Sequence, residues 1–137
     1  MIFVDSNIVM YLIGSDEAHR VRAQLLVDSA IHAREQLVTD AEVMQEILHR
    51  YAAIRRLDAI EPAFALLGAL ADDVLPVTGG DVRRASEIML ASHGRLSARD
   101  ALHLAVMQHA GIRRIMTFDS DFDSWPAAER VIGEAPT

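Results

Sequence analysis

Cysteine and lysine are both missing from this 137-residue sequence, and all 13 of its basic residues are arginine. Without cysteine it has no disulfide, no thiol nucleophile and no cysteine-bound zinc. Without lysine it has neither a phosphate-binding P-loop nor Schiff-base chemistry. No apolar run approaches the ~18 residues of a membrane span, and the chain enters a strand without the basic start of a signal peptide. We therefore expect a cytoplasmic protein with no membrane contact.

Positive charge is also scarce, because 20 acidic residues leave a net charge of -7. This balance argues against strong non-specific binding of nucleic acid. It does not exclude a nuclease, because the acidic residues of a metal site themselves add negative charge. A polyanion would then have to meet local arginines and bound cations. Hydrophobic residues make up 51% of the chain, enough for a buried core, and the length favours a single domain over residues 1–137.

Short apolar runs alternate with segments of helical periodicity along the whole sequence. This alternation predicts an α/β fold, a three-layer α/β/α sandwich with a mostly parallel central sheet. Within it, Gly79-Gly80 is predicted to be a turn. The second helix is predicted from the helical spacing of Val21, Leu25, Leu26, Ser29 and Ala30. The predicted strands are 1–5, 37–39, 74–78, 114–118 and 129–132, and the predicted helices are 6–13, 16–34, 39–56, 58–71, 81–92 and 97–110.

Acidic residues follow two of the predicted strands. Asp5 ends the strand Ile2-Phe3-Val4, and Asp119 follows the strand that begins at Arg114. Because sites in parallel sheets form beyond the carboxyl ends of the strands, these two acids should lie on one edge. Asp121 comes two residues later and can assist or replace Asp119.

The predicted helix 39–56 carries two glutamates. Glu46 lies about 60° from Val43, since each residue turns about 100°, and this places it at the border of the buried stripe. An exposed helix acid is the alternative for Glu46. Glu42 is explained by a capping box that starts at Thr39. The stripe itself is expected to contain Val43, Ile47, Tyr51 and Ile54.

Asp100 has two interpretations. The pattern Ser97-x-x-Asp100 is typical of a helix N-terminus, where a carboxylate is stabilised without any catalytic role. The following helix is apolar nearly all round and must be buried. An acid at the N-terminus of this helix is therefore also well placed for a functional site. His103, one turn further, is a ligand, a base or a packed core residue. Arg95 and Arg99 flank Asp100 and are either phosphate contacts or solvated charges.

Taken together and in order, these segments resemble a known family. The stretches MIFVDSN, LVTDAEVMQEILHRY, LSARDALHLAVMQHAG and IMTFDSDFD resemble the PIN domain, and more narrowly the VapC-type toxins of bacterial toxin–antitoxin pairs. The likeness covers about residues 1–133. It implies a metal-dependent endoribonuclease that hydrolyses RNA phosphodiester bonds. Carried over by position, the catalytic and metal-binding quartet is Asp5, Glu46, Asp100 and Asp119, with Asn7 and Asp121 in support.

Such a quartet suits a hard dication. Four close carboxylates repel one another unless a cation lies among them, and all-oxygen ligands favour Mg²⁺ or Mn²⁺ over zinc; one or two ions are both open. The resemblance further implies a homodimer and a cognate antitoxin whose tail covers the active site. An apolar surface on two successive helices is expected to bind this antitoxin, unless its residues are core: Ile54, Leu57, Ile60 and Phe64.

Three other functions compete with this interpretation. A haloacid-dehalogenase-type phosphatase also uses an aspartate after its first strand, but it needs Asp-x-Asp and a lysine. Here residue 7 is Asn7 and lysine is absent. A non-catalytic binding module with the PIN fold, and a DNA nuclease on the same fold, are the other two.

Overall fold

The computed structural model describes residues 1–132 and contains one sheet of five parallel strands in the order β3-β2-β1-β4-β5. The first strand of the chain is therefore central, and all five carboxyl ends meet on one edge. The strands are β1 (Ile2–Val4), β2 (Leu37–Asp40), β3 (Asp73–Leu75), β4 (Arg114–Met116) and β5 (Glu129–Val131).

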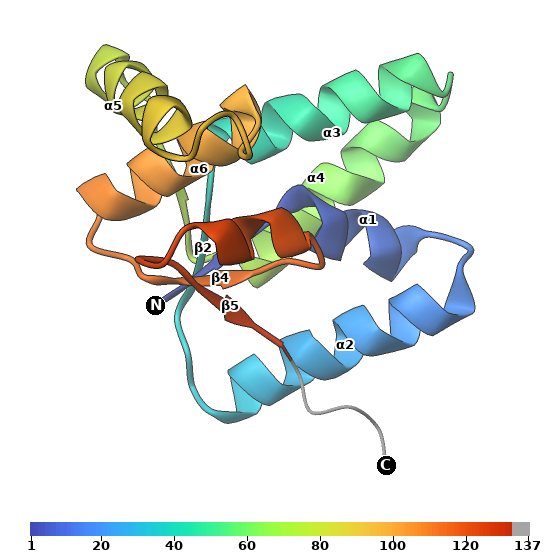
Figure 1. Cartoon of the computed structure of the whole chain (residues 1–137). Coiled ribbons are helices and arrows are strands. Elements are labelled where there is room, and N and C mark those ends of the chain that lie inside the picture. The colour runs from blue at the N-terminus through green and yellow to red at the C-terminus, as the bar shows by residue number, and fades with distance from the viewer. Residues whose placement is uncertain (133–137) are drawn as a thin grey trace.

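Helices cover both faces of this sheet, which confirms the three-layer α/β/α prediction. In Figure 1, α2 lies on one side of the sheet and α3, α5 and α6 lie on the other. No helix among residues 1–132 is long and apolar enough to cross a membrane. The helices are α1 (Ser6–Ile13), α2 (Glu17–His32), α3 (Ala41–Ala53), α4 (Ile60–Leu70), α5 (Gly79–Ala91) and α6 (Ala98–His109), with 3-10 turns at Leu57–Ala59 and Ser120–Ser124.

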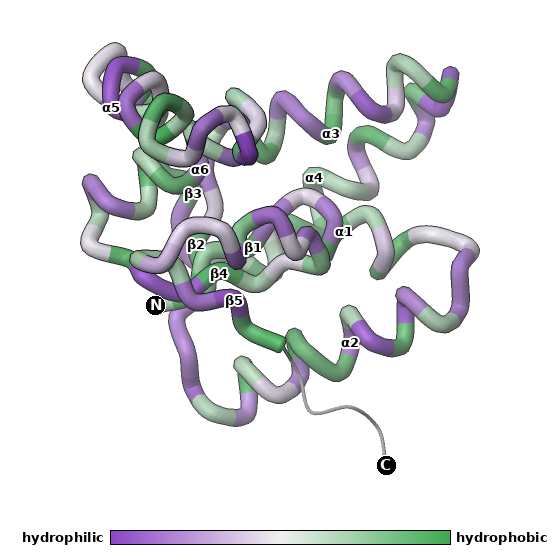
Figure 2. Tube along the Cα trace, in the orientation of Figure 1, coloured by the Kyte–Doolittle hydropathy of each residue, from purple (hydrophilic) through white to green (hydrophobic). Residues whose placement is uncertain are grey.

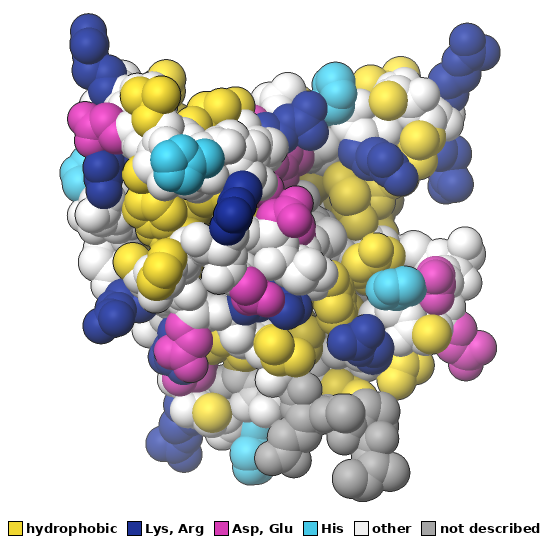
Figure 3. All heavy atoms as spheres, viewed as in Figure 1, with side chains coloured by type: hydrophobic (Ala, Val, Ile, Leu, Met, Phe, Trp, Pro, Cys, Tyr) yellow, Lys and Arg dark blue, Asp and Glu magenta, His cyan; other side chains and the backbone are white. Residues whose placement is uncertain are grey.

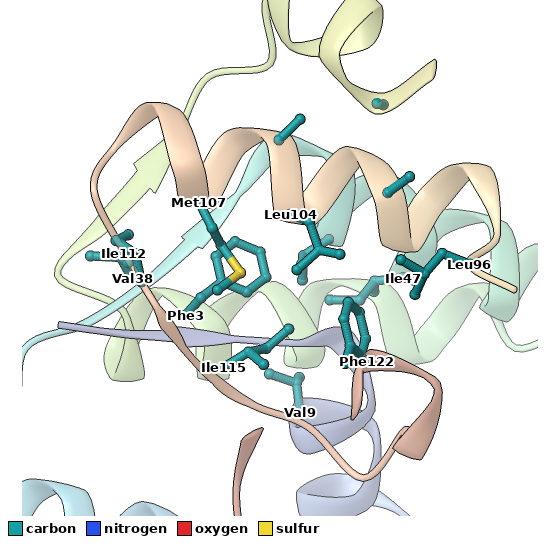
Figure 4. Packing of buried hydrophobic residues seen from close by; sticks show 14 of the residues in the cluster. Phe3, Val9, Val38, Ile47, Leu96, Leu104, Met107, Ile112, Ile115 and Phe122 are labelled. Carbon is teal, nitrogen blue, oxygen red and sulfur yellow. The ribbon is translucent and has the colours of Figure 1, made fainter. Parts of the chain in front are cut away.

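The core has two parts because side chains of a strand alternate between the faces of the sheet. Phe3 faces the larger cluster, which includes residues of α3, α4, α5 and α6, and Figure 4 shows it packing near Met107. Ile2 and Val4 face the smaller cluster with Leu26 of α2. In Figure 2, α4 is hydrophobic along most of its length, whereas α2 and α3 alternate between hydrophilic and hydrophobic segments. The buried α6 agrees with its apolar sequence.

The predicted capping box at Thr39 and Glu42 is wrong. Thr39 belongs to β2, where its hydroxyl donates to the Val4 carbonyl at 3.0 Å. The helix N-cap is instead Asp40, whose Oδ1 accepts the backbone N–H of Val43 at 2.8 Å. The sequence pattern led to the wrong N-cap because Thr39, the first residue of Thr39-x-x-Glu42, and Asp40 are both suitable N-cap residues for this helix. Glu42 is thereby left without its structural explanation.

Other differences concern helix ends and apolar faces. Gly79 and Gly80 are the first residues of α5 rather than a turn, because Thr78 and Asp81 on either side of them form a complete capping box. Segment 58–71 divides into a 3-10 turn and α4. Ile54 was expected in the core but is the C-cap of α3 and is 49% exposed. Val21 and Leu25 are exposed too, since α2 buries its other face through Ala23, Leu26, Val27 and Ala30.

Candidate metal centre

Asp5 lies at the carboxyl end of the central strand and begins α1. Its Oδ1 accepts the Ser6 backbone N–H at 2.7 Å, and its Oδ2 accepts the Thr117 hydroxyl at 2.7 Å. Burial raises the pKa of Asp5; the charge of His103 opposes this rise and the charge of Glu46 adds to it. A buried carboxylate with a raised pKa is a group whose ionised form gains from a cation.

Thr117 joins the two strand-end segments that the sequence places together. Besides donating to Asp5, its hydroxyl accepts the Asn7 amide at 3.0 Å and the Asp119 backbone N–H at 3.1 Å. The Asn7 side-chain oxygen accepts the Phe118 backbone N–H at 3.3 Å. Asn7 therefore holds the loop that carries Asp119. Sequence reasoning missed Thr117; its one local signal is a polar residue between the apolar Met116 and Phe118.

Glu46 is buried against His103 of α6. Its Oε1 lies 3.0 Å from His103 Nε2, while His103 Nδ1 lies 2.8 Å from Asp40 Oδ2. The same Nε2 is 3.9 Å from Asp5 Oδ1. Asp5, Glu46 and His103 thus form one buried group whose candidate ligand atoms all lie within 4.8 Å of one another. Although burial raises the pKa of Glu46, the hydrogen bond and charge of His103 prevail and lower it.

A second acidic group, Asp100, Asp119 and Asp121, also brings its carboxylate oxygens within 4.8 Å of one another. Ser97 caps α6 by accepting the Asp100 backbone N–H at 3.1 Å, so the cap side chain is serine and the Asp100 carboxylate faces other acids. Asp119 accepts the Asp121 N–H at 2.9 Å. Both aspartates after β4 are therefore near Asp100.

The electrostatics of Asp100 link the two groups. Burial together with the charges of Asp119 and Asp5 raises the pKa of Asp100 to about 6. Glu42, one turn before Glu46, has its pKa raised by burial and then by the charge of Glu46. Glu42 is therefore a further acid beside the site. In Figure 3, acidic side chains gather near the middle of this face, with basic side chains on several sides of them.

The donor set fits a hard dication. The candidate ligands in both groups are carboxylate oxygens apart from His103, and Mg²⁺ and Mn²⁺ prefer such oxygens. Burial raises the pKa values of Asp5 and Asp100, and the charges of neighbouring carboxylates raise them further. A divalent ion would stabilise their ionised forms. Asp121 is exposed, whereas Asp5 is buried. This arrangement suits an ion that the protein binds from the Asp5 side and that substrate reaches from the Asp121 side.

An α/β/α fold with acids gathered at the carboxyl edge of its sheet is the arrangement expected of an enzyme that uses a divalent metal. The PIN-domain model matches residues 2–127. Ribonuclease VapC13 of Mycobacterium tuberculosis is 53% identical over 131 residues, covering 96% of this chain and 99% of that protein. Ribonuclease VapC23 of the same species is 40% identical and covers 87% and 93%. The chain belongs to the PIN-domain family, among its VapC ribonucleases.

Solved structures confirm the fold. The crystal structure of Mycobacterium tuberculosis VapC20, a Sarcin-Ricin loop cleaving toxin, superimposes with a TM-score of 0.74 at 24% identity and covers 90% of this chain and 94% of that one. VapBC2 from Rickettsia felis, bound to a DNA fragment from its promoter, gives a TM-score of 0.73 at 11% identity and covers 96% and 98%. The family assignment sets aside the haloacid-dehalogenase alternative.

Proposed function

We propose that this chain is the toxin of a toxin–antitoxin pair and cuts RNA with Mg²⁺ or Mn²⁺ held by four carboxylates. The observation that carries the proposal is the convergence of acids from four distant segments at one edge of the sheet. The relatives named ribonucleases support RNA as the substrate. We also propose that the reaction takes place in the cytoplasm. The proposed catalytic and metal-binding residues are Asp5, Glu46, Asp100 and Asp119.

Each residue has a distinct task in this proposal. When bound, the cation makes water more acidic and offsets negative charge on the phosphodiester. Asp5, Asp100 and Asp119 hold the ion, directly or through water. Glu46 completes this set or orients the attacking water. Asn7 fixes the loop of Asp119, and Asp121 adds a further acceptor at the exposed side.

Aromatic and arginine side chains grouped around Phe118, the residue before Asp119, suit contacts with single-stranded RNA. Tyr11 lies one turn after Asn7 on α1 and stacks on His19, with ring centroids 4.3 Å apart. Phe118 meets Tyr11 edge-on at 5.3 Å, and the Arg22 guanidinium lies 5.2 Å from the centre of the Phe118 ring. Aromatic rings and arginine bind unpaired bases without requiring an overall positive charge. This matters in a chain of net charge -7.

We further propose an antitoxin partner and a homodimer. One structural neighbour, from Klebsiella pneumoniae, is described as a toxin–antitoxin complex. Of the four residues predicted to meet an antitoxin, Ile54 and Leu57 are exposed at 49% and 66%. Ile60 and Phe64 are half-buried and pack against the core. The exposed pair at the end of α3 is therefore the stronger candidate contact. Light scattering at several concentrations measures the oligomeric state.

The test of the proposed function is cleavage of a labelled single-stranded RNA by the purified chain. We expect cleavage with Mg²⁺ or Mn²⁺ and none with EDTA. Asp119→Asn should reduce cleavage by at least ~100-fold, equivalent to about 3 kcal/mol of transition-state stabilisation. Glu87→Gln is the matched control, because Glu87 pairs with Arg84 on α5 outside the site. Cleavage of DNA of the same sequence with RNA left intact would favour a DNA nuclease, and no cleavage of either would favour a binding module.

A further inference from the structure

We propose that His103, anchored by Asp40, is a positioning residue that holds the Glu46 carboxylate in the orientation that the metal site requires. The inference deepens the proposed function and rests on it. His103 contributes through Glu46 and does not bind the ion itself. Neither His103 nor Asp40 belongs to the four carboxylates that the family resemblance implies.

Both ring nitrogens of His103 are committed to carboxylates. Nδ1 lies 2.8 Å from Asp40 Oδ2, and Nε2 lies 3.0 Å from Glu46 Oε1. The His103 and Asp40 side chains have no exposed surface, and that of Glu46 is 10% exposed. Each ring nitrogen therefore forms one hydrogen bond with a carboxylate oxygen. A ring held at both ends in a packed core has one orientation, and this orientation fixes where Glu46 Oε1 lies.

Asp40 ties this arrangement to the start of α3. Its Oδ1 accepts the Val43 N–H at 2.8 Å and caps the helix, while its Oδ2 holds His103. Asp40 thus sets both the beginning of the helix that carries Glu46 and the ring that contacts Glu46. The buried Asp40 carboxylate therefore fixes the position of α3 relative to α6.

Glu46 needs such support because it is a long side chain with several rotamers. A ligand that is ordered before the ion arrives loses less conformational entropy on binding. Groups that hydrogen-bond a metal ligand from behind commonly change metal affinity or activity by about 10- to 100-fold when they are replaced. Removing His103 should therefore leave Glu46 present but poorly oriented.

The experiment measures Mn²⁺ affinity without RNA, by calorimetry and by the electron spin resonance signal of free Mn²⁺. We expect His103→Gln to weaken Mn²⁺ binding by about 10- to 100-fold and to lower kcat more than it raises KM. Asp40→Asn is the second variant, because asparagine caps a helix as well as aspartate does yet presents no anionic acceptor to His103. It should weaken Mn²⁺ binding in the same direction. His109→Gln is the control on the same helix, since His109 pairs with Asp81 and is 69% exposed.

A double-mutant cycle separates positioning from other roles. If His103 acts through Glu46, then His103→Gln in a Glu46→Gln background should change Mn²⁺ affinity by less than about threefold. An undiminished loss in that background would overturn the inference. Variants of His103 and Asp40 that unfold at lower temperature but bind Mn²⁺ like the parent would make His103 a core residue only.

Direct coordination is the other outcome that would overturn the inference. His103 Nε2 lies close enough to Glu46 and Asp5 for an ion to contact it. Labelling histidine with ¹⁵N decides this, because a nitrogen ligand produces hyperfine coupling in the pulsed resonance spectrum of bound Mn²⁺. We expect no coupling. Mn²⁺ binding without RNA cleavage by the parent would refute the proposed function alone, since the affinity comparison between parent and variants still tests the positioning of Glu46.

Discussion

Replacing Asp100 by asparagine distinguishes a helix-end residue from a member of the acidic site. The pKa of this carboxyl rises from 3.8 to about 6 because of burial and the charges of Asp119 and Asp5. At about 1.4 kcal/mol per pH unit, this rise sets an upper bound of ~3 kcal/mol on the cost of ionising Asp100 in the folded chain. The side chain is only half-buried, so solvent screening reduces the cost to about 1–2 kcal/mol.

The sign of the pH dependence follows from this rise. The folded chain binds the Asp100 proton more tightly than the unfolded chain does, so the stability due to this group is present at low pH. It is lost as the pH rises from about 4 to above 6. At pH 8 without metal, Asp100→Asn therefore removes about 1–2 kcal/mol of unfavourable burial and repulsion of the charge, and it loses about 0.3–1 kcal/mol of helix-dipole stabilisation. The variant should be more stable by roughly 0.5–1 kcal/mol, or about 2–5 °C in Tm.

Thermal denaturation of parent and variant in EDTA at pH 4.5 and pH 8 measures this difference. We expect the advantage of Asp100→Asn at pH 8 and little or none at pH 4.5. Adding Mg²⁺ should raise the parent's Tm and raise the variant's much less, because only the intact site binds the ion well. A variant that melts below the parent at pH 8, responds normally to Mg²⁺ and still cuts RNA would reduce Asp100 to a helix-end residue.

Three further predictions concern metal, substrate and partner. Ca²⁺ should bind the chain and compete with Mg²⁺ but support little cleavage, because its looser coordination positions water poorly; gel-based cleavage rates check this, and cleavage with Ca²⁺ at the Mg²⁺ rate would contradict it. Tyr11→Ala should raise KM for single-stranded RNA about tenfold and leave kcat within twofold, as the loss of one base-stacking contact does; an unchanged KM in steady-state assays would remove Tyr11 from the substrate site. Leu57→Ser should weaken antitoxin binding at least tenfold, as the loss of an apolar anchor does. The variant should melt at the same temperature as the parent, because Leu57 is 66% exposed. Equal antitoxin affinity of parent and variant in calorimetry would exclude Leu57 from the interface.

Much of the fold and the placement of the acids could be predicted because they depend on local and periodic signals. Asp5 and Asp119 follow strands whose carboxyl ends must share an edge when the sheet is parallel. Glu46 follows from its angle to Val43 on the helix, and the structure buries it at 8% exposure. The helix around Asp100 is apolar on nearly every side, and its burial was predictable for that reason.

The errors arise where neighbouring residues compete for one role. Thr39 and Asp40 are both good N-cap residues, and only the strand register assigns Thr39 to β2 and its hydroxyl to Val4. Two glycines in a row are typical of a turn, yet Thr78 and Asp81 supply enough capping bonds to start a helix there.

Long-range contacts were beyond sequence reasoning. The partners of His103 are 63 and 57 residues away in the chain, and Thr117 reaches Asp5 across 112 residues. No local pattern announces such pairs, because they depend on how α3, α6 and β4 pack together. The buried histidine was foreseen as a core residue, a ligand or a base, and only its two carboxylate partners point to the positioning role proposed above.

The central claim is that acids from four segments form one divalent-metal site, and locating the ion tests it most directly. Crystals of the chain grown with Mn²⁺ and measured at the manganese absorption edge reveal the ion by its anomalous scattering. The account predicts a peak among the carboxylates of Asp5, Asp100 and Asp119, with Glu46 in direct or water-mediated contact. Asp100→Asn crystals should show a weaker peak or none at the same place. Ordered crystals at saturating Mn²⁺ with no peak among these residues, or with the ion bound elsewhere, would contradict the account.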